Sequence, residues 1–411
     1  MNEKLQKLYD LAVDELTNNI LPWWIEHDVD EEHGGFYGAV TNDNAPVPHA
    51  TRFITLNARL VWTFSAAYRV MGNPEYTNYG TGSLNLRVTI ESYNASDDEN
   101  IEYNAANNRV DELGDPVSKQ RYIYGEAFAI YGLSEYARAM GCNEALEYAR
   151  KLVASLEKHV YDPVYKGYFE SCKSDWTHDP WTRGVNRLPT DEKTMNNHLH
   201  LIEAYTCLLR TDKSDFMQNK VREHLYVMLN KIVDHDIHHY FYFQARDWKP
   251  TTQEISFGHD IEGTWLMMET AEVLGEPEAM RYTKDTCMNM ARACYEQGFR
   301  KEDGAMLSEY DPVTGHSSPF LSWWEQNEAV VGFLNAWEVT GEEKYLDASL
   351  KCFEFAREHF VDHENGGWFA RLSLDGKTVL STDKVNDYTC PYHNSRMCME
   401  IIERYRKLSK A

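Results

Sequence analysis

The stretch EYARAMGCNEAL, residues 135–146, joins the end of one predicted helix to the start of the next. Gly141 can take the left-handed conformation that ends a helix, and the acidic residue beyond it favours the first turn of a new one. The junction recurs as AAYRVMGNPEY (66–76), a degenerate LLRTDKSDF (208–216), AEVLGEPEAM (271–280) and AWEVTGEEKYL (336–346). Successive copies lie 64 to 70 residues apart, so the 411-residue chain holds about six helical hairpins.

A second repeated marker is an acidic turn that leads into glycine and aromatic residues. It occurs as EEHGGFYG (31–38), YKGYFE (165–170), DGAML (303–307) and ENGGWFA (364–370), and we interpret it as a small hairpin that caps one end of each helix pair. Six helical hairpins can close into a ring with one helix of each pair inside. We therefore predict an all-α (α/α)6 barrel in a single domain, residues 1–411; an open helical solenoid is the alternative.

Residues 77–112 break the repeat, because they lack the helix and the glycine-aromatic turn due in the second unit. Val88, Ile90 and Tyr93 indicate a strand, and the tract rich in Asn, Asp and Glu around them is typical of a loop.

Composition and charge narrow the classes of partner. The chain has 65 acidic and 41 basic residues and a net charge of −24, so its overall field repels phosphate backbones and anionic lipids. No nucleic acid or membrane partner is expected. The N-terminal 20 residues lack the apolar core of a secretory signal, and eight scattered cysteines suit reduced thiols. We predict a cytoplasmic monomer or homodimer that acts on a small molecule.

Polar residues inside otherwise apolar inner helices are candidates for chemistry, because the inner helices of a barrel face a central cavity. Arg59 lies within LNARLVWTFS (56–65), either as a structural ion pair or as a cation that faces the cavity. In GHDIEGTW (258–265), His259 and Glu262 are three residues apart, so the carboxylate could orient the imidazole. The segment is not a zinc-binding HExxH.

KTMNNHLHLIEAYT (193–206) places Asn196, His200 and Glu203 on one face of a helix. His198 and His200 are two residues apart and diverge, so we predict no shared metal ion. For any one of these histidines taken alone, a structural role as a hydrogen-bonded core residue is as good an interpretation as a catalytic role.

Two further segments add aromatic and basic side chains. WWEQNEAVVGF (323–333) carries Trp323, Trp324 and Glu328; tryptophan more often fills a core, but it can also stack on the C–H face of a sugar. CPYHNSRMCME (390–400) places His393 at the start of a helix, with Arg396 three residues later. Tyr388 and Tyr392 flank this histidine and are candidates to face the cavity.

This set of residues points to proton transfer at carbon. A neutral imidazole with a pKa near its ordinary value of about 6.5 is a competent acid or base at neutral pH. Two imidazoles on opposite faces of one carbon can remove a proton and return it on the other side. Arg59, or a third imidazole such as His200, can stabilise the enediolate oxygens formed between these steps. No cofactor and no metal ion are required.

Seven segments, in order along nearly the whole chain, resemble the cellobiose 2-epimerases, a branch of the N-acylglucosamine 2-epimerase family. They are GGFYG (34–38), LNARLVWTFS, YGEAFAIYGLSEY (124–136), KTMNNHLHLIEAYT, GHDIEGTW, WWEQNEAVVGF and CPYHNSRMCME. The family fold is an (α/α)6 barrel, in agreement with the repeat count. The resemblance implies ring opening of a reducing-end glucose or mannose residue, removal of the C2 proton and reprotonation of the opposite face.

The resemblance also implies roles for individual residues. His259 and His393 correspond to the acid/base pair, His200 and Arg59 to stabilisers of the enediolate, and Glu262 and Glu328 to groups that orient these side chains or the sugar hydroxyls. The predicted substrate-binding residues are Tyr124, Asn196, Trp323, Trp324 and Tyr388. Tyr388 departs from the family, which usually has tryptophan five residues before the last histidine. Residues 77–112 are a second departure.

Several alternatives remain open at this point. The substrate could be cellobiose, mannobiose, lactose or a monosaccharide, and the chain could be an N-acylglucosamine 2-epimerase or an aldose–ketose isomerase. A glycosidase on the same barrel would use opposed carboxylates from Asp260, Glu262 and Glu328. A non-catalytic sugar-binding protein would use the tryptophans alone.

Overall fold

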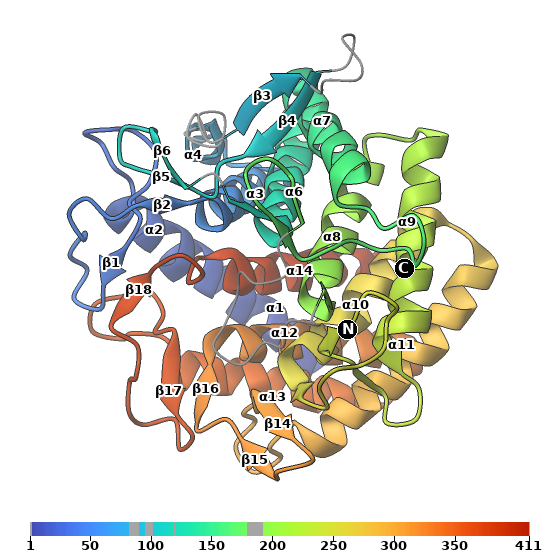
Figure 1. Cartoon of the computed structure of the whole chain (residues 1–411). Helices are drawn as coiled ribbons and strands as arrows, with labels where there is room; N and C mark the ends of the chain where they lie inside the picture. The colour runs from blue at the N-terminus through green and yellow to red at the C-terminus, as the bar shows by residue number, and fades with distance from the viewer. Residues whose placement is uncertain (1, 82–89, 95–101, 119, 179–191, 411) are drawn as a thin grey trace.

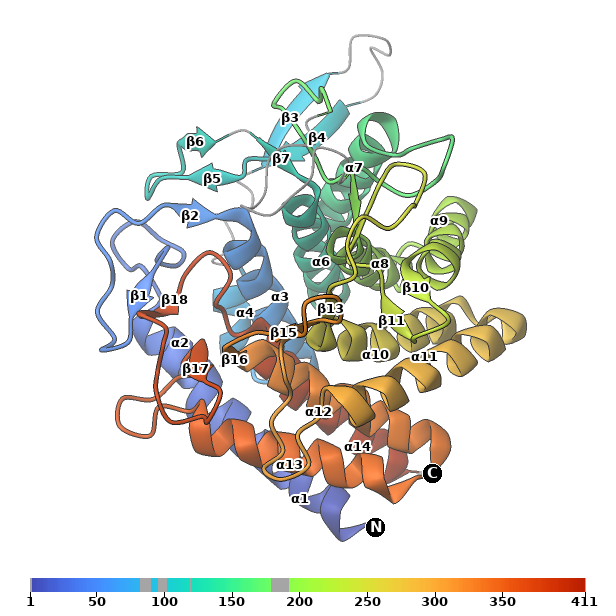
Figure 2. The ribbon, with the colours of Figure 1, turned by 60° about the horizontal axis from the view of Figure 1, so that its bottom comes forward.

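The computed structural model describes residues 2–81, 90–94, 102–118, 120–178 and 192–410. Within this part of the chain, six helices form an inner ring: α3 (Ile54–Met71), α6 (Ile123–Met140), α8 (Met195–Leu209), α10 (Phe257–Leu274), α12 (Trp323–Thr340) and α14 (Tyr392–Leu408). Each packs on the next, and α14 packs back on α3 (Figure 2). The ring is closed, which confirms the predicted (α/α)6 barrel; the open solenoid was wrong.

The outer helices complete the pairs. They are α1 (Glu3–Glu15) and α2 (Leu21–His27), joined by a π-helical turn at Leu16–Ile20, then α4 (Glu75–Thr81), α7 (Asn143–His159), α9 (Asp215–Val227) with a π-helical turn at Met228–Ile232, α11 (Pro277–Gln297) and α13 (Glu343–His359). The sixth pair joins the two ends of the chain, since α1 packs on α14 (Figure 1). The repeat is therefore closed by the termini.

Glycine ends four of the inner helices as the sequence predicts. Gly72, Gly141, Gly275 and Gly341 have φ values of 74°, 65°, 71° and 73°, a region that disfavours residues with a Cβ. In the degenerate copy α8 ends without glycine, and the Ser214 side chain caps α9 instead.

Short antiparallel ladders cover the end of the barrel where the inner helices begin. The strands are β1 (Val40–Thr41), β2 (Arg52–Phe53), β5 (Arg109–Val110), β6 (Pro116–Ser118), β7 (Arg121–Tyr122), β8 (Ser171–Cys172), β9 (Lys193–Thr194), β10 (Val233–Asp234), β11 (His239–Tyr240), β12 (Phe243–Gln244), β13 (Ile255–Ser256), β14 (Glu309–Asp311), β15 (His316–Ser317), β16 (Phe320–Ser322), β17 (Arg371–Ser373) and β18 (Asp383–Val385). Bridges such as Tyr161–Tyr168 and Val361–Trp368 close the predicted glycine-aromatic turns. Five of these strands lead directly into an inner helix and fix where it begins.

Buried ion pairs hold this end of the barrel. Lys193 of β9 contacts Asp162 at 3.1 Å, and Lys384 of β18 contacts Asp362 at 2.8 Å. Each joins the strand before an inner helix to the turn after an outer helix. A buried amine of this kind is held by its carboxylate, because neither could stay charged there alone.

The described residues of the atypical stretch adopt mostly strand. Strands β3 (Ile90–Asn94) and β4 (Glu102–Ala106) form an antiparallel pair, and β4 packs on α7 at the margin of the molecule (Figures 1 and 2). Ile90 and Tyr93 lie in β3 as predicted, whereas Val88 is outside the described residues. The predicted lack of helix was wrong for residues 77–81, which belong to the short helix α4.

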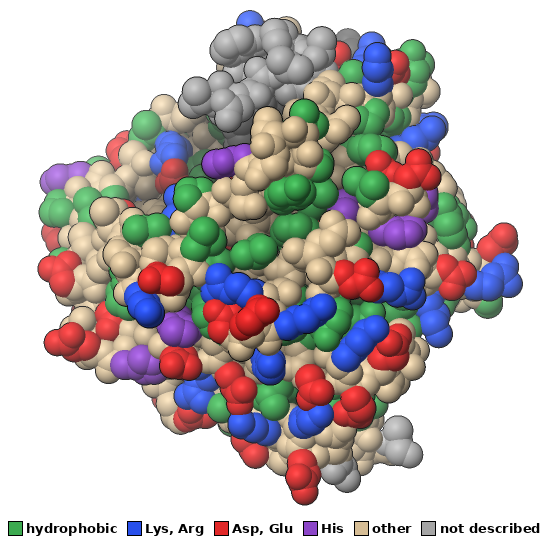
Figure 3. Space-filling view, turned by 90° about the horizontal axis from the view of Figure 1, so that it is seen from below, with side chains coloured by type: hydrophobic (Ala, Val, Ile, Leu, Met, Phe, Trp, Pro, Cys, Tyr) green, Lys and Arg blue, Asp and Glu red, His purple; other side chains and the backbone are tan. Residues whose placement is uncertain are grey.

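The face seen in Figure 3 intersperses acidic and basic side chains in its lower half and gathers hydrophobic side chains near the middle. None of the helices in the described ranges is both long enough and apolar enough to cross a membrane.

Candidate active site

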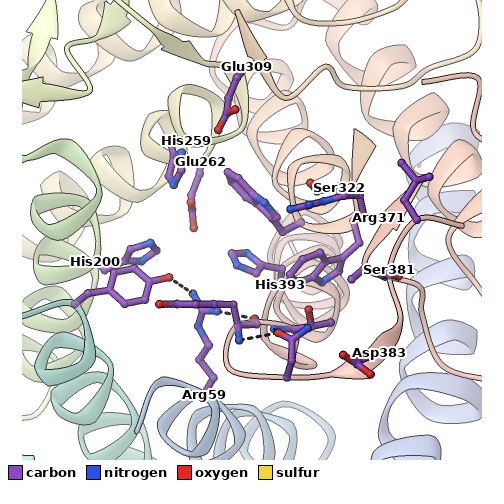
Figure 4. Close-up of a pocket in the computed structure, with 18 of the residues that line it drawn as sticks. Arg59, His200, His259, Glu262, Glu309, Ser322, Arg371, Ser381, Asp383 and His393 are labelled. Atoms are coloured by element: carbon purple, nitrogen blue, oxygen red, sulfur yellow. Dashed lines mark hydrogen bonds between the residues drawn. The ribbon is translucent and has the colours of Figure 1, made fainter. Parts of the chain in front are cut away.

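A cavity of ≈ 540 Å³ opens where the inner helices begin, beneath the short strands. Its inner wall carries His200, His259 and His393 together with Glu262 and Arg59, all directed toward one open space (Figure 4). We call this the front cavity. Its remaining walls are Tyr124, Tyr242, Glu309, Ser322, Trp323, Trp324, Ala370, Arg371, Leu380, Ser381, Thr382, Asp383, Asn386, Tyr388 and Thr389.

His393 is oriented by a carboxylate. It lies in the first turn of α14, and its Nδ1 is 2.7 Å from Oε1 of Glu328. The second oxygen of Glu328 accepts a hydrogen bond from Trp265 at 3.1 Å. A carboxylate can only accept unless it is protonated, so Nδ1 carries the proton and Nε2 presents its lone pair to the cavity. Burial, then Arg59 and Arg396, hold the pKa of His393 well below its ordinary value. Glu328 therefore lies behind the catalytic candidate and outside the cavity wall.

His259 is oriented by a hydroxyl. Its Nδ1 is 2.7 Å from Oγ of Ser256, the residue that ends β13 just before α10. The expectation that Glu262 orients this imidazole was wrong, because Glu262 hydrogen-bonds Arg396 instead. A serine hydroxyl can donate or accept, so either tautomer of His259 is allowed. Burial, then the nearby His200 and His393, hold the pKa of His259 well below its ordinary value.

His200 and His198 diverge as the sequence predicts. His200 faces the cavity, with Nδ1 3.0 Å from Oε2 of Glu203. His198 faces away: its Nε2 accepts the Tyr168 N–H at 3.0 Å, and its ring stacks on His224. Burial lowers the pKa of His200, and the Glu203 carboxylate opposes that shift. Of the two histidines, only His200 is placed to meet a ligand.

Arg59 is a cavity-facing cation whose partners are neutral. Its guanidinium donates to the Tyr124 hydroxyl at 2.7 Å and to the carbonyl oxygen of Tyr388 at 3.1 Å. It also lies 4.1 Å from the ring centroid of Phe128. These contacts do not form the structural ion pair that the sequence analysis gave as one alternative for Arg59. The positive charge of Arg59 is thus available to an anion in the cavity.

Arg396 is the residue whose role the sequence analysis missed. This fully buried guanidinium contacts Glu203, Glu262 and Glu328, the last at 2.6 Å, and also the Tyr392 hydroxyl. One cation therefore serves three carboxylates, two of which hold His200 and His393. Its place three residues after His393, on the same helix face, was the available signal.

Glu262 presents an unused oxygen to the cavity. Its Oε1 contacts Arg396, and its buried Oε2 has no hydrogen-bond partner among the described residues. Burial and the neighbouring Glu328 carboxylate raise the pKa of Glu262 well above its usual range. A raised pKa favours the protonated carboxyl, which can donate as well as accept at Oε2.

Trp324 packs near both catalytic candidates. Its ring centroid is 4.6 Å from that of His259 and 5.6 Å from that of His393. Gly258 makes room for this ring, because a Cβ there would come within 2.6 Å of it. Trp323 and Tyr388 also line the cavity, whereas Asn196 does not, and its buried Oδ1 has no hydrogen-bond partner in the part of the chain that the structure describes. Sequence reasoning missed Gly258 and the rim residues Tyr242, Glu309, Arg371 and Asp383.

Two groups of described residues bring three possible metal ligands within 4.8 Å of one another. Glu262, Glu328 and His393 form one group, and the guanidinium of Arg396 already bonds both of its carboxylates. His239, Asp260 and Cys294 form the other, in which His239 Nδ1 is hydrogen-bonded to Asp260 at 2.8 Å. These contacts are those of ion pairs and hydrogen bonds within the protein.

Comparisons with known proteins agree with this arrangement. Residues 35–394 match the model of the family described as N-acylglucosamine 2-epimerase (GlcNAc 2-epimerase). A cellobiose 2-epimerase of Bacteroides fragilis is 37% identical over 388 residues, which cover 94% of this chain and 97% of that protein. The solved structure of cellobiose 2-epimerase from Spirochaeta thermophila aligns with a TM-score of 0.86 at 33% identity and covers 98% of both chains.

The barrel and these matches define the class of the protein, a carbohydrate epimerase built on six helical hairpins. More specifically, the chain belongs to the N-acylglucosamine 2-epimerase family.

A glycoside hydrolase of family 76 from Bacteroides thetaiotaomicron shares the fold, with a TM-score of 0.64 at 11% identity over 98% of this chain and 99% of that one. At that identity the likeness concerns the barrel alone, because one fold hosts many chemistries.

Proposed function

We propose that this protein inverts C2 of the reducing-end glucose or mannose residue of a β-1,4-linked disaccharide, with His259 and His393 as the acid/base pair. The observation that carries the proposal is the pair of imidazoles that both pack near Trp324 in one cavity, each held at Nδ1 and open at Nε2. Proton transfer to and from two faces of one carbon requires two such groups.

The reaction begins when the sugar ring opens and C1 becomes an aldehyde. One neutral imidazole takes the C2 proton; the C–H electron pair forms a C1=C2 double bond, and the carbonyl pair moves to O1. The other imidazole, in its protonated form, then gives a proton to the opposite face of C2 while the carbonyl re-forms. The ring closes on the inverted carbon. Atoms and electrons balance without an oxidant or a reductant.

Arg59 and His200 stabilise the enediolate between the two proton transfers. Because the partners of Arg59 are a hydroxyl, a carbonyl and aromatic rings, its charge is not neutralised before the substrate develops negative charge. Preorganised donors of this kind act most strongly on charge that appears only in the transition state. The carboxyl of Glu262, whose unpartnered Oε2 is described above, is the group proposed to hydrogen-bond a sugar oxygen.

A disaccharide is favoured over a monosaccharide by the size and the walls of the site. The front cavity of ≈ 540 Å³ lies within the usual range for small-molecule sites, about 300–1,000 Å³. Trp323, Trp324 and Tyr388 offer flat faces on which sugar C–H groups can stack. The relatives at 30% identity or more that carry a specific name are called cellobiose 2-epimerase, which agrees with this choice.

Proton NMR in D2O tests the proposal directly. Purified protein is incubated with cellobiose or mannobiose, without added metal or nucleotide. We expect the C2 epimer to appear with deuterium at C2. Release of free glucose or mannose would indicate a hydrolase, and failure to convert either disaccharide would contradict the proposed substrate class.

A further inference from the structure

A second cavity, of ≈ 350 Å³, lies at the opposite end of the same barrel. Its walls come from the later turns of the inner helices, whereas the front cavity is built from their first turns. Trp62 on α3 and Asn335 on α12 are examples. We call this the rear cavity, and none of the chemistry proposed above uses its volume.

Seven glutamates and five arginine or lysine side chains line the rear cavity, and three of these cations, Arg69, Arg210 and Arg404, are paired across neighbouring helices. Arg69 of α3 contacts Glu135 of α6 and Glu403 of α14, the latter at 2.6 Å. Arg210 of α8 contacts Glu269 of α10. The excess of carboxylates disfavours an anion, and the paired cations leave no isolated charge for a simple ion to neutralise.

The floor of the rear cavity is aromatic and contains one unsatisfied donor. Trp62, Tyr131 and Trp265 lie there, with Trp62 and Tyr131 stacked at 5.2 Å between ring centroids. Asn335 is 5% exposed, its Oδ1 accepts from Arg404, and its buried Nδ2 has no partner among the described residues. A buried amide donor without a partner costs free energy, of the order of 1–3 kcal/mol. A bound acceptor would remove that cost.

We propose that the rear cavity binds one neutral sugar ring, a monosaccharide-sized polyol. Hydroxyl groups both donate and accept, so they suit walls that mix carboxylates, guanidinium groups and an amide, and the C–H faces of a sugar suit the aromatic floor. The volume lies near the lower limit of small-molecule sites, about 300 Å³, which fits one ring better than two.

Glu203 connects the two cavities. It lines the rear cavity, yet its Oε2 is 3.0 Å from Nδ1 of His200 in the front cavity, and its Oε1 contacts Arg396 and Tyr392. A sugar that hydrogen-bonds Glu203 from behind would compete for the carboxylate that holds His200. Rear-site occupancy is therefore expected to alter kcat, whereas a sugar in the front cavity raises the apparent KM.

Binding of 2-deoxy-2-fluoro-D-glucose, followed by 19F NMR, tests the proposal without requiring turnover. We expect two classes of saturable site in the native protein. Excess cellobiose should displace the fluorinated sugar from the front cavity only. This step alone rests on the proposed function. Asn335→Leu, which removes the amide donor at similar volume, should weaken the rear class at least tenfold. Trp324→Ala is the matched control and should weaken only the front class.

Asn335→Asp keeps the shape of the side chain and serves if Asn335→Leu does not fold. A single class of site that cellobiose displaces completely would overturn the proposal, as would a second class that neither Asn335 variant changes. Where epimerisation is observed, glucose should inhibit the native enzyme with a kcat component that Asn335→Leu loses. Purely competitive inhibition would also contradict the rear site.

Discussion

The two ends of the barrel are lined by the same six helices but treat charge in opposite ways. At the rear, Arg69 and Arg404 each contact carboxylates on neighbouring helices. At the front, the partners of Arg59 among the described residues are all neutral, and His259 and His393 keep one ring nitrogen open. The charges of the rear arginines are balanced by carboxylates of the protein, whereas the charge of Arg59 at the front is left to interact with a substrate. Lack of compensation, more than the presence of polar residues, distinguishes a site for chemistry from a structural network.

The largest effect should come from the histidines of the front cavity. His259→Asn and His393→Asn remove the proton-transfer groups and should each lower kcat about 10²–10⁴-fold. The rate of epimerisation and deuterium incorporation at C2 measure this. His316→Asn, an exposed histidine on β15, is the matched control and should leave both unchanged. Near-native turnover in both front variants would remove the distinction between the two ends.

Arg396 tests how much the pairing of buried opposite charges contributes to stability. Arg396→Met leaves three carboxylates without their shared cation and should lower the free energy of unfolding by about 3–5 kcal/mol. Arg404→Met breaks half-buried contacts with Glu338, Glu400 and Asn335 and should cost less, about 1–2 kcal/mol. Urea denaturation measures both. Equal losses in the free energy of unfolding would mean that burial does not determine how much each charge network contributes to stability.

Arg59 tests the uncompensated cation itself. Arg59→Met should lower kcat about 10²–10³-fold, because the enediolate loses a preorganised cation. The rear variant Arg404→Met should stay within about threefold of the native kcat, since its charge is already paired. Initial rates at saturating disaccharide decide between these outcomes. A comparable loss in the two variants would show that pairing does not determine which arginine acts in catalysis.

The pH dependence should give the smallest effect. His259 and His393 have pKa values held well below 6.5, so the histidine that acts as base stays neutral as the pH falls toward 6.5. The other histidine must carry a proton to act as the acid, so kcat/KM should rise, by up to about tenfold, between pH 7.5 and 6.5, and the acid limb set by the base should appear only at lower pH. An ordinary histidine would already be half protonated at about pH 6.5. A midpoint at 6.5 or above would contradict the depressed pKa.

The repeat made most of the fold predictable. Gly72, Gly141, Gly275 and Gly341 set the period, and a closed ring of hairpins follows once six units are counted. The period could not reveal that the sixth pair combines α1 with α14, because that pair is separated by nearly the whole chain. The sequence indicated strand β3 but not its partner β4, because a short, polar segment gets its structure from tertiary contacts rather than local preference.

The candidate site was predictable in its residues but not in its connections. Histidine and arginine inside apolar helices identify the cavity wall, yet sequence spacing suggested Glu262 as the partner of His259, where the structure places Ser256. Helical spacing describes one helix at a time. Arg396 joins carboxylates from α8, α10 and α12, a relation that exists only after the ring closes.

The direction of the inner helices has one more consequence. All six begin at the front cavity, so the positive ends of their backbone dipoles converge on it, each equivalent to roughly half an elementary charge. The backbone itself thus favours negative charge at that end, whatever side chains stand there. The proposed enediolate is therefore favoured by a field that the barrel supplies through its topology, and the electron-rich ends of the same helices face the arginines at the rear.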